Sequence, residues 1–111
     1  MNTSSPVKEF ILCAAIHYKD GKVHTHQPVN IESGLVICGM RHCNCYSVLS
    51  GLLGDFDGKL LVGRDGQGFI TSHDRYVDRQ EAFLIAKANN QIHHKLFDND
   101  DTGTLCSEDL Y

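Results

Sequence analysis

The sequence predicts an α+β fold, in which a small antiparallel sheet starts with an N-terminal hairpin and carries two main helices. An apolar run near the N-terminus is followed by Asp-Gly, a dipeptide that favours a two-residue turn. Apolar residues then recur at helical spacing after residue 42, and a carboxylate pair marks a second helix start near residue 78. The 111 residues suffice for one domain and not for two, so we expect a single domain over 1–111.

The hairpin is expected between about residues 9 and 27. Residues 10–18 are apolar until their end, which is typical of a strand buried on both faces or of a short core helix. Asp20-Gly21 suits the turn, and residues 23–26 alternate until Pro28 ends the run. Residues 68–72 indicate another short strand, and residues 35–39 indicate either a strand or the approach to a helix.

The first helix is expected from His42 to the glycine at 54, which suits a left-handed helix end. Its apolar face is expected to comprise Cys45, Val48, Leu49, Leu52 and Leu53.

The second helix is the clearer one. Asp78 is expected to accept a hydrogen bond from a first-turn N–H, and Glu81 to reach back to the N–H of Asp78, as in a capping box. Its buried face is expected to comprise Ala82, Ile85, Ala86 and Asn89, widened by Phe83.

Composition excludes several classes of protein. No run approaches the ~20 apolar residues that span a bilayer. Residues 1–6 lack the basic and apolar regions of a signal peptide, and five cysteines, an odd number, then indicate reduced thiols in a cytosol. The net charge of −4 argues against binding DNA or RNA polymers, which needs a broad basic surface, although a few converging arginines can hold a small anion.

Two motifs offer metal ligands. The first combines His24 and His26 with His42, Cys43 and Cys45, but zinc sites favour paired cysteines in two separate knuckles. On a helix, Cys43 and Cys45 point apart, so we favour a core Cys45 and a partly exposed Cys43.

The second motif, over residues 98–109, begins like a calcium loop, with oxygen-bearing residues at its first, third and fifth positions and glycine at its sixth. Its last position is Asp109 in place of the usual glutamate, and no exiting helix follows. An acidic, solvated turn is the favoured interpretation, and no metal or other cofactor is predicted.

No catalytic residue is predicted. The chain lacks the Gly-x-Ser-x-Gly elbow, and its one His-x-Thr-like stretch, His24-Thr25-His26, has no second copy of the kind that a paired-histidine phosphoesterase needs.

Arginines gather instead at the two helix starts, in Arg41-His42, Arg75-Tyr76 and Asp78-Arg79. Helix starts favour anions, arginine grips phosphate, and an aromatic ring can stack on a base. The alternative is that Tyr76 is a hydrophobic staple and the arginines are solvated.

Several of these motifs together resemble a family of small phage proteins, the first type of Thoeris anti-defence protein. The resemblance rests on Gly68 to Ser72, Arg75 to Ala82, Ile85-Ala86, Gln91-Ile92, Ser107 to Tyr111, Ala14 to Ile16 and Arg41 to Cys43. It implies a sponge that binds a cyclic ADP-ribose signal, or a cyclic oligonucleotide at a separate site, without cleaving it. It further implies an α+β protomer, dimers that assemble into hexamers, pockets shared between protomers, and a host cytoplasmic location.

The resemblance and the anion motifs yield one set of expected ligand-binding residues. Arg41 with His42, Arg75 and Arg79 are candidates for the phosphates, and Phe69 or Tyr76 for stacking on the base. Asp78 is a candidate for contacting an adenine amino group. Relatives in this family would carry Asn at this position, and the carboxylate of Asp78 would repel a nearby phosphate. Lys95 is placed to close the pocket from a second protomer. The alternative functions are a phosphoesterase that degrades the same signal and a small zinc- or calcium-binding regulatory module.

Overall fold

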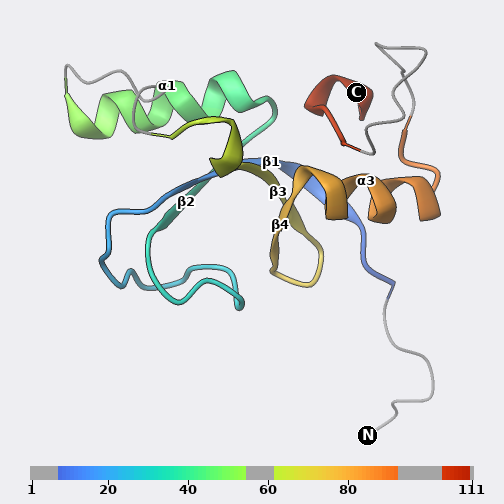
Figure 1. The fold of residues 1–111 in the computed structure, drawn as a ribbon, viewed down its shortest axis with the longest axis horizontal. Helices are drawn as coiled ribbons and strands as arrows, with labels where there is room; N and C mark the ends of the chain where they lie inside the picture. Colours follow the sequence, from blue (N-terminus) through green and yellow to red (C-terminus); the bar gives the residue numbers. More distant parts are fainter. Residues whose placement is uncertain (1–7, 55–61, 93–103, 111) are drawn as a thin grey trace, which may run out of the picture.

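The computed structural model describes residues 8–54, 62–92 and 104–110. Four antiparallel strands form a sheet in the order β2-β1-β3-β4 (Figure 1). They are β1 (Ile11–Tyr18), β2 (Leu35–Gly39), β3 (Gln67–Thr71) and β4 (Tyr76–Asp78). The helices are α1 (His42–Leu53) and α3 (Arg79–Ala88), with short 3₁₀ turns η1 (Arg64–Gly66) and η2 (Ser107–Asp109). The predicted α+β class is therefore confirmed.

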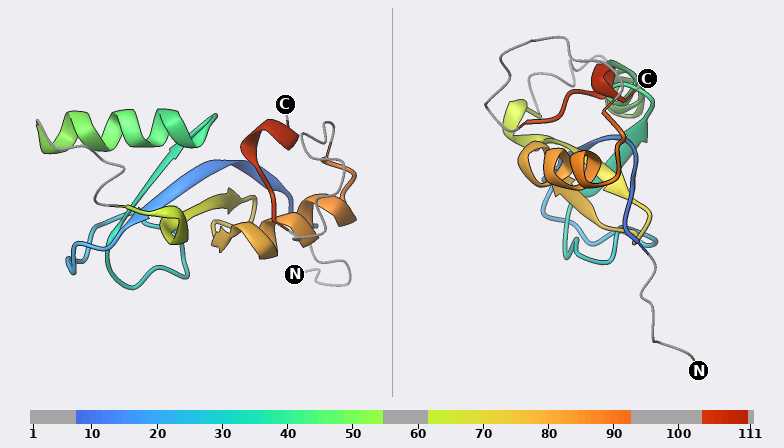
Figure 2. Two further views of the ribbon diagram at one scale, coloured as in Figure 1. Left: turned by 45° about the horizontal axis from the view of Figure 1, so that its top comes forward. Right: turned by 90° about the vertical axis from the view of Figure 1, so that its right-hand side faces the viewer.

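One hydrophobic core joins the sheet, both helices and the C-terminal segment. Alternate residues of the strands, such as Ile16 in β1 and Phe69 in β3, are fully buried on the face beneath α1. Leu49 of α1, Ala82 of α3 and Leu105 of the C-terminal segment are fully buried in the same cluster. Figure 2 shows α1 and η2 on the same side of the sheet, with α3 alongside. The two helix starts and the C-terminal segment are thus fixed relative to one another by a shared core.

The predicted position of the hairpin's second strand is wrong. β1 pairs with Leu35–Gly39, and residues 23–26 form no strand. The Asp20 carboxylate accepts hydrogen bonds from the Lys22 N–H (2.9 Å) and from His24 Nε2 (2.8 Å), which turns the chain away from β1. The apolar, β-branched run of β2 pairs with the edge of β1 that residues 23–26 leave free. The two strands of the hairpin are therefore joined by a longer connection than predicted.

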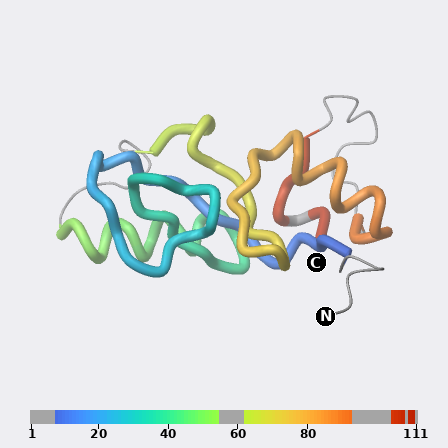
Figure 3. The backbone as a smooth tube through the Cα atoms, turned by 90° about the horizontal axis from the view of Figure 1, so that it is seen from below, coloured from blue at the N-terminus to red at the C-terminus, as the bar shows by residue number. Residues whose placement is uncertain are grey.

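The connection between β1 and β2 lies on the sheet face opposite α1 (Figure 3). Asn30 fixes it to β4, because its side-chain amide donates to the Tyr76 carbonyl (2.6 Å) and its side-chain oxygen accepts from the Tyr76 N–H (2.8 Å). Backbone groups of an edge strand are in this way satisfied by a side chain from a loop.

The prediction of α1 is confirmed, but its buried face differs in part. Cys45 and Leu49 are buried as expected, Tyr46 joins them, and Val48 and Leu52 are 48% and 64% exposed. The glycine at 54 has the positive φ of +81° that was expected, although its ψ of −123° departs from a left-handed helix end.

The start of α3 carries half of the predicted capping box. Asp78 Oδ1 accepts the Glu81 N–H at 2.8 Å, as expected. The Glu81 carboxylate does not complete the box; it accepts from Arg75 Nη2 at 2.7 Å. A cationic partner therefore outcompetes the backbone N–H for this carboxylate.

Candidate functional site

The antiparallel pairing of β3 with β4 brings two distant segments together. Gly68 pairs with Asp78, so the residues just before Gly68 lie across from the residues that open α3. His42, the first residue of α1, donates from Nε2 to the Gly68 carbonyl at 2.9 Å. The starts of α1, β3 and α3 consequently meet at one place.

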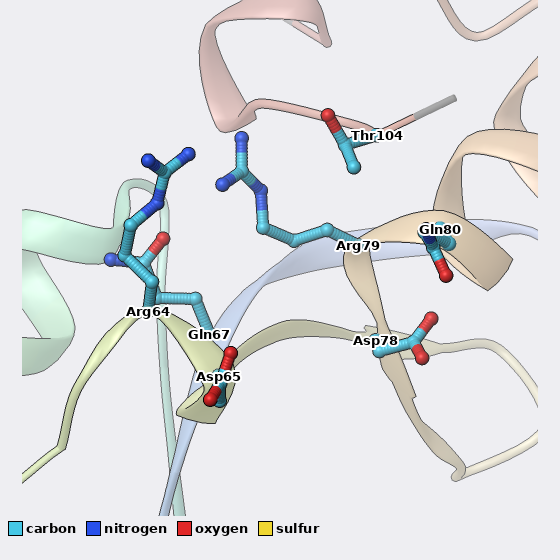
Figure 4. A pocket seen from close by; sticks show the side chains of 7 residues that line it. All are labelled: Arg64, Asp65, Gln67, Asp78, Arg79, Gln80 and Thr104. Atoms are coloured by element: carbon cyan, nitrogen blue, oxygen red, sulfur yellow. The ribbon is translucent and has the colours of Figure 1, made fainter. Parts of the chain in front are cut away.

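Two adjoining pockets open there, and they share Gln67 and Arg79. The first, of about 340 Å³, is also lined by Arg64, Asp65, Asp78, Gln80 and Thr104 (Figure 4). The second, of about 220 Å³, is also lined by Arg41, His42, Cys43, Cys106 and Ser107. We call the two pockets together the arginine groove, because Arg41, Arg64 and Arg79 all line it.

Charge is unevenly spread along the arginine groove. Its carboxylates, Asp65 and Asp78, both line the first pocket, whereas the second pocket has two arginines and a histidine in its lining and no carboxylate. In Figure 4, Arg64 and Arg79 extend to the same side of the first pocket, away from Asp65 and Asp78. The end near Arg41 is thus the more favourable for an anion.

Arg79 joins the groove to the C-terminal segment. Its Nε donates to the Leu105 carbonyl (2.9 Å) and its Nη2 to Cys106 Sγ (3.0 Å), while the Leu105 N–H donates to the Arg79 carbonyl (3.0 Å). This arginine is therefore no solvated side chain: it fixes residues 105 and 106 and still faces both pockets.

Arg75 lies apart from the groove and is paired with carboxylates. Its guanidinium binds both oxygens of Glu9 (2.8 and 3.0 Å) and one oxygen of Glu81 (2.7 Å). The hydrogen bond from Arg75 holds the pKa of Glu9 at about 2, well below its ordinary value of 4.5. This pairing counts against the phosphate-binding role expected for Arg75, because two carboxylates already neutralise it.

Neither expected aromatic residue faces the groove. Phe69 is fully buried in the core, with the His42 ring edge-on to it at 5.1 Å between centroids, so the expected stacking of a base on Phe69 conflicts with its burial. The Tyr76 ring lies beside His17 (5.6 Å between centroids), and its hydroxyl donates to the Gly66 carbonyl at 2.8 Å. Burial raises the pKa of Tyr76. These contacts hold Tyr76 on the face of β4 opposite α1, and they do not form the hydrophobic staple that was the alternative interpretation.

Of the remaining residues expected to bind ligand, some line the groove and one lies outside the described part of the chain. Arg41, His42 and Asp78 line the groove with Arg79. Lys95 and most of the 98–109 motif lie outside the described residues. Asp109, the described end of that motif, is buried and accepts the Cys106 N–H at 2.9 Å, so its carboxylate already serves as a cap.

The zinc hypothesis finds no cluster of ligands. Within residues 8–54, 62–92 and 104–110, no three histidine, cysteine or acidic side chains are placed to hold a metal ion. Cys45 is buried in the core and Cys43 is exposed, as the favoured interpretation has it.

Sequence reasoning missed Arg64, Gln67 and Cys106. Arg64 precedes a predicted strand, inside a glycine-rich stretch that indicates only a connection. The available signal was the hairpin register: a strand near 68 paired with residues before a helix at 79 places residues 64–67 beside Arg79.

Comparison with known proteins gives the family. Residues 10–111 match the family model described as phage T4 y16D protein. The chain belongs to this phage protein family. No curated protein and no solved structure shows a significant similarity to it. Among the described residues, no helix is both long enough and apolar enough to cross a membrane.

Proposed function

We propose that this phage-family protein is an anti-defence sponge, which binds a cyclic nucleotide immune signal of the cyclic ADP-ribose class in the arginine groove and does not cleave it. The observation that carries the proposal is the convergence of Arg41, Arg64 and Arg79 on two adjoining pockets of an otherwise acidic chain. A cyclic ADP-ribose presents two phosphates within one compact ring. Guanidinium forks are the side chains best suited to grip such oxygens.

The openings of two helices support the same ligand class. Arg41 occupies the N-cap position of α1 and Arg79 is the first residue of α3, so both guanidinium groups reach the groove from helix starts, where the helix dipole also favours anions. The two carboxylates, Asp65 and Asp78, oppose a long polyanion such as DNA or RNA, and the chain's net charge of −4 does the same.

Sequestration requires a ligand that is largely enclosed, because nanomolar affinity corresponds to about −12 kcal/mol. The proposal therefore includes a homo-oligomer, a dimer that assembles into a hexamer in the host cytoplasm, in which a second protomer covers the groove. Met40, Val48 and Leu52, which are 48–64% exposed near α1, supply apolar area for such an interface.

The decisive experiment is calorimetric titration of the purified protein with cyclic ADP-ribose and its cyclic isomers. Arg64→Ala should weaken binding by about 10- to 100-fold, because a hydrogen bond to a charged group contributes ~1.5–3 kcal/mol. Lys87→Ala is the matched control: it removes one cation from exposed helix surface that lines neither pocket of the groove, and it should leave affinity unchanged. Equal losses in the two variants would reject the groove as the site.

A phosphoesterase is the second candidate, because Arg79 Nη2 donates to Cys106 Sγ at 3.0 Å and so favours a nucleophilic thiolate in the groove. The protein should be incubated with the signal and heated, and the released ligand analysed by chromatography. Intact ligand supports sequestration, whereas an altered ligand whose formation is abolished by Cys106→Ser supports the enzyme. Native mass spectrometry of the same mixtures gives the number of protomers and ligands.

A further inference from the structure

Two cysteines on neighbouring strands lie together on the sheet face opposite α1. In the pairing of β1 with β2, Cys38 stands opposite Ala15, and Cys13 comes two residues before Ala15, so all three share one face. Cys13 and Cys38 are therefore diagonal neighbours in an antiparallel pair, and the right-handed twist of the strands draws one diagonal of each such set together.

A β-bulge fixes the direction in which Cys13 points. The register of β1 with β3 shifts between Ile11 and Cys13, which leaves Leu12 as the extra residue and sets Cys13 opposite Ile70. Without that extra residue the side chains of β1 before it would exchange faces. The bulge thus keeps Ile11 buried while Cys13 stays on the face of Cys38.

The two thiols interact and are accessible. The neighbouring Cys38 thiol lowers the pKa of Cys13 to about 7, and the neighbouring Cys13 in turn raises the pKa of Cys38. One proton of the pair is thus lost more readily than from a lone thiol, and the other is retained. Cys38 is exposed and Cys13 is partly exposed, so a small reagent can reach them.

We propose that Cys13 and Cys38 form a redox-active dithiol that reacts with small disulfides such as oxidised glutathione. The Cys13 thiolate attacks one sulfur of oxidised glutathione, forms a mixed disulfide and releases one glutathione thiolate. Cys38 then loses its proton and attacks the Cys13 sulfur, which closes the intramolecular disulfide and releases the second glutathione. The protein pair is oxidised by two electrons and the glutathione disulfide is reduced by two.

The other cysteines are placed differently. Cys45 is fully buried in the core, Cys43 lies exposed on α1, and Cys106 contacts Arg79 in the arginine groove. The dithiol lies on the opposite face of the sheet from α1 and does not depend on the function proposed for the groove.

The test equilibrates the full chain in glutathione buffers of increasing oxidising strength, blocks free thiols with an alkylating reagent, and measures intact mass and peptide maps. The expected result is a species that carries two fewer alkyl groups than the reduced protein, with a peptide that links Cys13 to Cys38. Cys43→Ser is the matched control and should form the same linkage. Separate glutathione adducts on Cys13 and Cys38 without the linkage, or a linkage between other cysteines, would overturn the proposal. Both outcomes can be observed with the wild-type protein, so the test does not depend on whether a variant folds.

Reaction rates supply an independent readout. Alkylation of Cys13 at pH 7 should slow about threefold in Cys38→Ala, since the gain in thiolate from the lowered pKa is partly offset by weaker nucleophilicity. Cys38→Ser, which keeps a hydroxyl donor, should restore the rate but form no linkage. An unchanged rate in Cys38→Ala would show that Cys38 does not activate Cys13.

Discussion

Replacing Glu9 with glutamine tests whether Arg75 is a structural residue and not a ligand-binding one. Glu9 precedes β1, yet its carboxylate accepts both Nε and Nη2 of Arg75 and the hydroxyl of Thr71. The side chain of Glu9 is 18% exposed and that of Arg75 is 33% exposed, so the pair is partly shielded from water. Glu9→Gln keeps the shape and removes the charge.

The pKa of Glu9 sets the magnitude of the expected effect. Its pKa in the folded protein is about 2 against an ordinary 4.5, and the chief cause is the hydrogen bond from Arg75. At 1.36 kcal/mol per pKa unit, this difference gives a ceiling of about 3 kcal/mol in the free energy of unfolding. Solvent screening at the partly exposed Arg75 reduces the expected loss at pH 7 to about 1–2 kcal/mol.

Urea unfolding at several pH values measures this loss and its sign. A carboxylate with a depressed folded pKa stabilises the protein above its unfolded pKa, and that stabilisation disappears as the pH falls from about 4.5 towards 2. The unfolding free energies of wild type and Glu9→Gln should therefore differ at pH 7 and converge below pH 4. Equal stabilities at pH 7, or a gap that stays constant down to pH 3, would refute the reasoning.

Three further substitutions probe the site and its supports. Asp78→Asn retains a side-chain oxygen for the Glu81 N–H but removes the charge of a carboxylate expected to accept hydrogen bonds from the ligand, so calorimetry should show several-fold weaker binding of cyclic ADP-ribose at an unchanged urea midpoint. Asn30→Ala removes both hydrogen bonds to the Tyr76 backbone and should cost about 1–2 kcal/mol of unfolding free energy, measured in urea. Gly68→Ala should lower the melting temperature sharply, since its added Cβ would meet Val77 O and the Tyr76 ring well inside contact distance; a wild-type melting curve for this variant would contradict the model of the β3–β4 pairing.

Local chemistry made part of the fold predictable. The cap at Asp78 and the apolar spacing of α1 act within one or two helical turns, so both helices could be located from sequence. The partner of β1 could not, because two nearby segments competed for the same edge. Asp20, which looked like a turn residue, accepts hydrogen bonds from Lys22 and His24 and diverts the chain.

The arginines illustrate the same limit for the site. Arg75 and Arg79 look equivalent in sequence, four residues apart at the start of one helix. Long-range contacts separate their roles. Glu9, 66 residues away, forms an ion pair with Arg75. Arg79 instead donates hydrogen bonds to Leu105 and Cys106 and lines the groove. Arg64 enters the site only through the β3–β4 register. No local pattern encodes these three outcomes.

The uneven charge of the groove predicts the orientation in which the proposed ligand would bind. Phosphates are expected between Arg41 and Arg79, where the lining carries no carboxylate, because an anion placed beside Asp65 or Asp78 would meet like charge. Those two carboxylates are instead suited to accept hydrogen bonds from ribose hydroxyls or an adenine amino group. A compact ring with its phosphates at one end and its donors at the other satisfies both ends, whereas an evenly charged polyanion satisfies only one. The aspartates that weaken the groove as a general anion site are therefore expected to favour the proposed nucleotide over other anions.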